Sequence, residues 1–293
     1  LWMLQNYITN KNSYRLVSGK GTRPARTKLS KGGLAGAWCW IGLVLVIAIG
    51  IPYFSIIASS LIKLRCYGLA PGNFTLANYI ELFTTDRSLN AIGNSLFLAV
   101  SSACVCSVLG TLAVLAVRRS KGRLGKIVEG VSMLPEMLPA IVLVIGIMLF
   151  WNAIYKVIPL YNTMGIMVLA YVVLYLPYTV QYVTSSFTQI NDSLLQAGRT
   201  FGGSPFYVFR RVTLPMISRG VLAGWMMIFI IAFRELVTAS LIAPPNVLVV
   251  STYINREFEQ GSVSLGMAMA VLCVLITTTA LLIMNTVTER EKK

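Results

Sequence analysis

Six long apolar stretches limit what this chain can fold into. A hydrocarbon core about 30 Å thick is crossed by roughly 20 apolar helical residues, and each stretch is about that long. None of the stretches alternates as a barrel strand would, and helices are the other way to satisfy every backbone group in lipid. The predicted spans are residues 34–61, 91–117, 134–151, 163–183, 220–241 and 265–284. We therefore predict an all-α polytopic membrane protein with six transmembrane helices.

Composition agrees with this prediction. Hydrophobic residues make up 56% of the 293 residues and charged residues only 12%, whereas about a quarter of the residues in a soluble domain are charged. Most of the chain is therefore expected to lie in lipid.

The placement of the basic residues explains the net charge of +15. They gather before the first span, after the second, between the fourth and fifth, and after the sixth. The opposite side holds fewer: Lys63, Arg65, Arg87, Lys156 and Arg256. Cytoplasmic loops carry an excess of Lys and Arg, so we expect both termini and residues 186–219 in the cytoplasm. Lipid headgroups then account for the basic excess, and we expect no nucleic-acid partner.

Several kinds of chemistry are missing from the sequence. The chain has no His, which excludes a His-based catalytic triad, a His metal site and a His proton relay. Cys104 and Cys106 point away from each other on a helix, so we expect the cysteines to be small packing residues and no metal site. A phosphate-binding Gly-x-x-x-x-Gly-Lys run is also absent. We expect neither an enzyme nor a bound cofactor, and any ATP would be used by a partner subunit.

A polar segment separates the fourth and fifth spans and contains signals for two short helices. We call this segment, residues 193–217, the polar island. Ser193 can cap the first helix, and Gln196 can reach back to complete a capping box. Gly202 and Gly203 stop that helix, because Gly enters the left-handed conformation without a Cβ clash. The small Ala197 and Gly198 would let a partner approach the backbone closely.

The second helix of the island starts at once. Ser204 is a good N-cap and Pro205 a good first helical residue. We predict that this helix ends near Leu214, because Pro215 disfavours helical geometry in the residue before it. Such a pair of helices beside a membrane has the shape of a docking element; the alternative is an ordinary interfacial loop.

The island resembles the signature loop of binding-protein-dependent ATP-binding-cassette (ABC) importer permeases. That signature is Glu-Ala-Ala, three residues, Gly, nine residues, Ile, one residue and Leu-Pro. The matching residues are Gln196-Ala197-Gly198, Gly202, Val212 and Leu214-Pro215, and the spacing is intact. Gln196 replaces the usual Glu and Gly198 the second Ala, so a Glu-dependent salt bridge to the ATPase would be absent.

This resemblance implies a type I importer permease in the inner membrane, with a six-span domain over residues 34–293. The island would sit in a cleft of a cytoplasmic ATPase dimer, an extracytoplasmic binding protein would deliver the substrate, and a second six-span half would complete the pathway. The implied ATPase-coupling residues are Gln196, Ala197, Gly198, Gly202, Pro205, Arg210, Arg211, Leu214 and Pro215.

A narrower resemblance concerns the substrate. Residues 14–21 and Phe233-Arg234-Glu235-Leu236 resemble the second half of fused, twelve-span permeases for ferric iron. The basic segment over residues 1–33 would then be a linker between two halves; the alternative is the cytoplasmic tail of a stand-alone permease. Ferric iron is the expected substrate, with a polyamine, thiamine or phosphonate as alternatives.

Three ionisable residues fall within predicted spans: Glu136, Arg234 and Glu235. A charge in lipid costs about 2.5 to 3.5 kcal/mol on insertion scales, so we expect these side chains along the translocation pathway. Arg234 could instead pair with a carboxylate of a neighbouring helix, and Glu136 could lie solvated at the cytoplasmic interface. A secondary transporter with broken helices at the membrane midplane is a further alternative, but it gives the island no purpose.

Overall fold

The computed structural model describes residues 30–120, 123–188, 190, 193–194, 198 and 200–290. The described part is almost entirely helical, as predicted, and the chain separates into two compact units, Leu1–Pro52 and Tyr53–Lys293. Most of the predicted tail or linker lies outside the described residues. Its last residues are already helical, because α2 (Lys31–Leu45) begins after Ser30, whose Oγ accepts the Gly33 N–H.

The first predicted span is a single helical run. Helix α2 continues through the π-helical turn η1 (Val46–Gly50) into α3 (Ile51–Ser60). Among the described residues, five helices are long and apolar enough to cross a membrane, and a sixth span results if one bent helix pair is counted.

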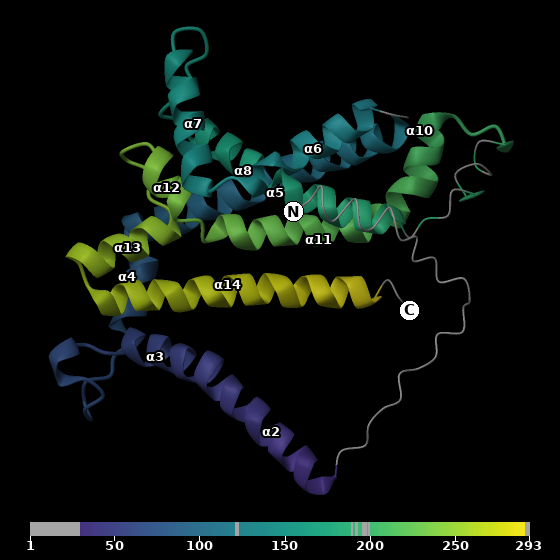
Figure 1. Cartoon of the computed structure of the whole chain (residues 1–293). Coiled ribbons are helices and arrows are strands. Elements are labelled where there is room, and N and C mark those ends of the chain that lie inside the picture. Colours follow the sequence, from purple (N-terminus) through teal and green to yellow (C-terminus); the bar gives the residue numbers. More distant parts are fainter. Residues whose placement is uncertain are drawn as a thin grey trace. The chain divides into compact units, whose positions relative to one another are not determined.

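The second unit contains the remaining helices. In chain order they are η2 (Arg65–Tyr67), α4 (Ala77–Thr84), α5 (Asp86–Arg119), α6 (Arg123–Met137), α7 (Ala140–Ala153), α8 (Met164–Thr188), α10 (Pro205–Val208), η3 (Phe209–Thr213), α11 (Leu214–Phe233), α12 (Val237–Ile242), α13 (Val250–Gln260) and α14 (Val263–Arg290). Helices α5, α8 and α11 pack against one another, and α14 packs against α4, α11 and α13. Figure 1 shows α10 at one end of α11 and α12 at the other.

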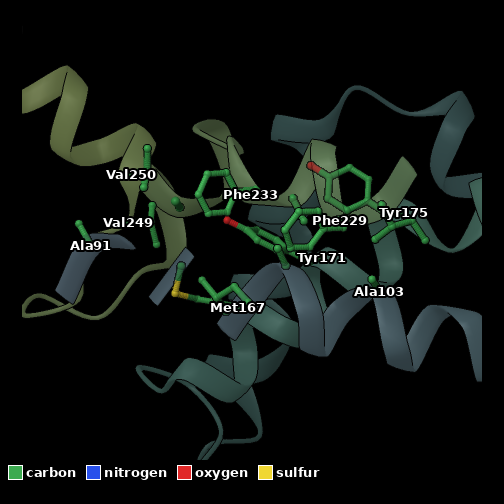
Figure 2. Packing of buried hydrophobic residues seen from close by; sticks show 14 of the residues in the cluster. Ala91, Ala103, Met167, Tyr171, Tyr175, Phe229, Phe233, Val249 and Val250 are labelled. Carbon is green, nitrogen blue, oxygen red and sulfur yellow. The ribbon is translucent and has the colours of Figure 1, made fainter. Parts of the chain in front are cut away.

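The core of this unit is aromatic and aliphatic. Tyr171 and Tyr175 of α8 pack beside Phe229 and Phe233 of α11 in one buried cluster, which Ala103 of α5 joins (Figure 2). The rings of Phe229 and Phe233 are stacked, with centroids 6.0 Å apart. Large aromatic faces therefore fill the centre of the unit where α8 and α11 meet.

Glycines bring the three central helices close together. A Cβ added at Gly224 of α11 would lie 3.1 Å from the Cα of Thr179, and one at Gly220 would lie 2.8 Å from the Tyr182 carbonyl oxygen. On the other side, a Cβ at Gly110 of α5 would lie 2.7 Å from Thr179 Cγ2. Small residues four apart allow such backbone contact between membrane helices. Helix α8 is therefore closely packed between α5 and α11 at Thr179.

The third predicted span is not one continuous helix over residues 134–151. Helices α6 and α7 are separated by a break and bent by 109°. Pro139 is the N-cap of α7, and its ψ of 131° lies outside the helical region. A proline also disfavours helical geometry in the residue before it, so α6 and α7 are separated at Leu138 and Pro139. Pro135 lies inside α6 without ending it.

The fifth predicted span, residues 220–241, is also interrupted. Helix α11 begins earlier, at Leu214, and ends at Phe233, and α12 begins only at Val237. The residues between them carry no Pro or Gly. A side-chain hydrogen-bond network around Glu235 holds this break, as described below.

Candidate functional site

The glycine turn of the polar island has the predicted geometry. Gly202 has a φ of 80°, in the left-handed region, and the Gly203 N–H donates to the Gly198 carbonyl at 3.1 Å. This bond is the one that closes a Schellman motif at a helix C-terminus. Gly203 is also required to be small, because a Cβ there would lie 2.6 Å from the same carbonyl oxygen. The predicted stop at Gly202 is therefore confirmed.

The start of the second helix is confirmed as well. Ser204 is the N-cap of α10, its Oγ accepts the Tyr207 N–H at 3.2 Å, and Pro205 is the first helical residue. Sequence-local rules were sufficient here because every partner in the cap lies within four residues.

The prediction that this helix ends near Leu214 is wrong. Residues Pro205–Phe233 form one helical run in which α10, the π-helical turn η3 and α11 follow without interruption. In an α-helix the ring of Pro215 would clash with the carbonyl of Arg211 and leave it without a donor. Arg211 lies in η3, and a wider π turn accommodates such a misfit without ending the helix.

Gly198 serves packing inside the element. A Cβ on Gly198 would lie 3.3 Å from Val208 Cγ2 and 3.9 Å from Val212 Cγ2, and Val208 is buried. The two helical segments of the island therefore approach each other at Gly198. The predicted site residues Gln196 and Ala197 lie outside the described residues.

The outer surface of the island is aromatic and basic. Phe201 is 91% exposed, Phe206 71% and Tyr207 58%, and Arg210 and Arg211 are also exposed. We call Phe201, Phe206 and Tyr207 the aromatic patch. Exposed apolar patches mark interaction sites, and aromatic residues often dominate binding energies. Sequence analysis missed the aromatic patch, although its aromatics flank the Gly-Gly-Ser-Pro turn.

Glu235 organises the break between α11 and α12. The Tyr175 hydroxyl of α8 donates to Glu235 Oε2 at 2.6 Å, and Glu235 Oε1 accepts the Thr238 N–H at 3.0 Å and the Thr238 hydroxyl at 3.1 Å. The Ser251 hydroxyl of α13 donates to the Glu235 backbone carbonyl. Glu235 therefore joins α8, α12 and α13 at the point where α11 stops.

Arg234 does not share this network. Its side chain is exposed and, within the described part of the chain, forms no ion pair with Glu235 or any other carboxylate. The expected alternative, a salt bridge to a neighbouring helix, is therefore not formed among these residues.

Glu136 lies at the end of α6, next to the bend into α7. The Gln181 amide of α8 donates to Glu136 Oε2 at 2.6 Å, and both side chains are exposed. The carboxylates of Glu136 and Glu235, both predicted to line the pathway, are thus at different breaks, and each accepts a hydrogen bond from α8. The described residues contain no group of three or more Cys, Asp or Glu side chains placed to hold a metal ion.

Relatives of this chain are membrane permeases. The Fe(3+)-transport system permease protein FbpB 2 of Haemophilus influenzae is 28% identical over 78% of this chain, which corresponds to 42% of the relative. The spermidine/putrescine permease PotC of the same organism is 26% identical over 66% of this chain and 73% of its own length. The chain thus spans less than half of the iron permease and most of the polyamine permease.

Solved structures agree on the fold. A bacterial ABC transporter involved in import of the acidic polysaccharide alginate matches with a TM-score of 0.72 and 16% identity, over 89% of this chain and 96% of that one. The MetNI methionine ABC transporter matches with a TM-score of 0.58 and 15% identity, over 69% and 94%. The fold is that of type I ABC importer permeases.

A family profile covers more than half of the sequence. The profile described as binding-protein-dependent transport system inner membrane component matches residues 107–293. This region includes α8, the polar island, α11 and both carboxylates discussed above. The chain therefore belongs to the family of binding-protein-dependent transport system inner membrane components, the permeases of ABC importers.

Proposed function

We propose that residues 193–215 of this permease are the coupling element through which a cytoplasmic ATPase dimer drives import. One observation carries the proposal: the helical run from Pro205 to Phe233 joins Phe206 and Tyr207 of the exposed aromatic patch to the centre of the membrane unit without a break. A force applied to the aromatic patch would therefore be passed along a stiff helix.

The glycine contacts extend this rigid path. Because Gly220 and Gly224 touch the backbone of α8, α8 would move together with α11. The rigid run ends at Phe233, and α12 begins at Val237 and runs in a different direction (Figure 1). Closure of the ATPase dimer would thus shift the equilibrium between two arrangements of the spans. A partner drives a two-state element in this way.

Charge placement supports the orientation. The basic residues around the island, including Arg210 and Arg211, favour the cytoplasmic side of the inner membrane, together with both termini. The opposite face would receive the substrate from a binding protein. A second six-span half, in the same or another chain, would complete the pathway.

Ferric iron is the substrate that we propose first, since an Fe(3+) permease is among the relatives. A polyamine is the second candidate, because PotC aligns over a larger share of its own length. Both are cations. We place the translocation pathway near Glu136, Arg234 and Glu235, the ionisable residues at the two span breaks.

Transport measurements test the proposal. The complete transporter, purified with its ATPase and binding protein, would be placed in proteoliposomes and supplied with labelled Fe(III) or spermidine. We expect uptake that requires ATP and the binding protein and is insensitive to dissipated ion gradients. Uptake driven by an ion gradient alone would support a secondary transporter and contradict the proposal.

A turn variant tests the coupling element itself. Gly202→Val strains the turn, because φ at 80° costs about 1–2 kcal/mol for a residue with a Cβ. We expect ATP hydrolysis to persist while ATP-dependent uptake falls at least about tenfold. Gly72→Val is the matched control, since Gly72 has a φ of 88° in the loop before α4. Normal uptake by the Gly202 variant would refute coupling through this turn.

A further inference from the structure

The two span breaks share one arrangement. At the break between α11 and α12, Glu235 accepts a hydrogen bond from Tyr175; at the break between α6 and α7, Glu136 accepts one from Gln181. Both donors belong to α8, which is continuous from Met164 to Thr188. Helix α8 therefore fixes a carboxylate at each place where a neighbouring span is broken.

The two carboxylates differ in how many donors they already have. Glu235 is half-buried and receives three hydrogen bonds, one on Oε2 and two on Oε1. Glu136 is exposed and receives one, on Oε2; no described residue donates to its Oε1. A carboxylate offers about four lone-pair positions. Most lone-pair positions of Glu136 therefore remain available for a ligand, whereas most of those of Glu235 already accept hydrogen bonds from the protein.

We infer from its distance to the nearest basic residues that Glu136 lies within the hydrocarbon region. It follows Lys126 by ten residues of α6, which at 1.5 Å per residue corresponds to about 15 Å. Its partner Gln181 precedes Phe187 by six residues, or about 9 Å, and Phe187 packs under the Arg118 guanidinium. An ionised side chain at such depth cannot face lipid without a cost of several kcal/mol, so it faces a polar path or protein.

We propose that the Glu136 carboxylate, oriented by Gln181, contacts a cationic substrate as it crosses the membrane, and that Glu235 is a positioning residue for the outer break. This inference rests on the proposed importer function. Carboxylate oxygens suit hard cations such as Fe(III), and they also accept hydrogen bonds from ammonium groups. The Gln181 amide holds one oxygen and leaves the other directed to the substrate.

An isosteric variant isolates the charge. Glu136→Gln keeps the shape and can still accept the Gln181 hydrogen bond through its amide oxygen. In proteoliposomes with the complete transporter, we expect uptake of labelled Fe(III) or spermidine to fall at least about tenfold. ATP hydrolysis stimulated by the loaded binding protein should stay within about twofold of wild type, because the coupling element is untouched. Glu136→Asp should recover part of the uptake.

A double variant tests the role assigned to Gln181. We expect Gln181→Leu to reduce uptake less than Glu136→Gln, and the combined variant to transport no more slowly than Glu136→Gln alone. Independent structural effects would instead add. Glu259→Gln on α13 is the control, because Glu259 is exposed and bonded only to Asn255 among the described residues.

The outcomes separate this inference from the importer function. Unchanged uptake by Glu136→Gln, or a parallel loss of uptake and stimulated hydrolysis, would overturn the role of Glu136 and leave the importer intact. Wild-type uptake of only a neutral or anionic solute would overturn the cationic substrate class. Absence of any ATP-dependent uptake by wild type would overturn the importer function itself. The Fe(III) and spermidine arms distinguish a metal ion from an organic cation.

Discussion

The helical run from Pro205 to Phe233 is held very differently at its two ends. At the Pro205 end, which we propose to be the cytoplasmic end, the side chains of Phe206 and Tyr207 are mostly exposed. At the Phe233 end, the proposed outer end, Phe233 is buried and the following Glu235 bonds to α8 and α12. The two ends are joined by a segment in which Gly220 and Gly224 contact α8.

This contrast separates two uses of the same helix. The Pro205 end makes few contacts within its own chain and is available to a partner. The Phe233 end is held by hydrogen bonds and stabilises the fold. The glycine segment between them lies close against the backbone of α8. Substitutions at the middle and outer end should therefore change stability, and substitutions at the cytoplasmic end should change partner binding alone.

The largest effect is expected in the middle segment. Gly220→Ala places a Cβ against Ser186 and 2.8 Å from the Tyr182 carbonyl oxygen, so α11 and α8 must separate. Overpacking of this kind costs about 1–3 kcal/mol. We expect a lower thermal unfolding temperature in detergent and weaker transport.

Gly130→Ala is the matched control for the middle segment. A Cβ on Gly130 of α6 meets nothing within 4 Å, and Ala is favoured over Gly in a helix by about 0.5–1 kcal/mol. Equal unfolding temperatures for Gly220→Ala and Gly130→Ala would show that close contact with α8 is unimportant.

The outer end should give the next largest effect. Glu235→Ala leaves the Tyr175 hydroxyl and the Thr238 N–H without their acceptor, and each unsatisfied group costs about 1–3 kcal/mol if it stays buried. We expect a lower unfolding temperature, with partial recovery in Glu235→Gln. A Glu235→Ala protein with wild-type stability would mean that the network does not hold the break.

The cytoplasmic end should affect binding only. We expect Phe206→Ala to change the unfolding temperature by little, because its ring is 71% exposed. Aromatic hot spots contribute about 2 kcal/mol or more to an interface, so the Kd for the ATPase should rise at least about tenfold. Tyr155→Ala, in the loop after α7 and 48% exposed, is the control. Unchanged ATPase binding by the Phe206 variant would remove the aromatic patch from the interface.

Local sequence rules predicted the polar island well but not its continuation. The turn at Gly202 and the cap at Ser204 depend on partners within a few residues. The prediction that Pro215 ends the helix is wrong, because the π turn η3 accommodates the proline. The rule for proline in a helix considers only the α-helical case.

Of the two span breaks, one has a local sequence signal and the other depends on a distant residue. Pro139 signals the break after α6, although the apolar length of residues 134–151 predicted a single span. The break after Phe233 has no such signal, because it depends on Tyr175, which is 60 residues away from Glu235 in sequence. The contact between Gly220 and α8 is equally non-local, although the spacing of Gly220 and Gly224 indicates a packing face.

Cross-linking from a single cysteine at position 206 tests the central claim most directly. Phe206→Cys would be made in a chain whose five native cysteines are replaced, alongside Tyr155→Cys. We predict that a membrane-impermeant maleimide labels position 206 only in inside-out vesicles, and that this position cross-links to the ATPase. Labelling of position 206 from the outside, or cross-linking to the ATPase from position 155 instead, would contradict the account.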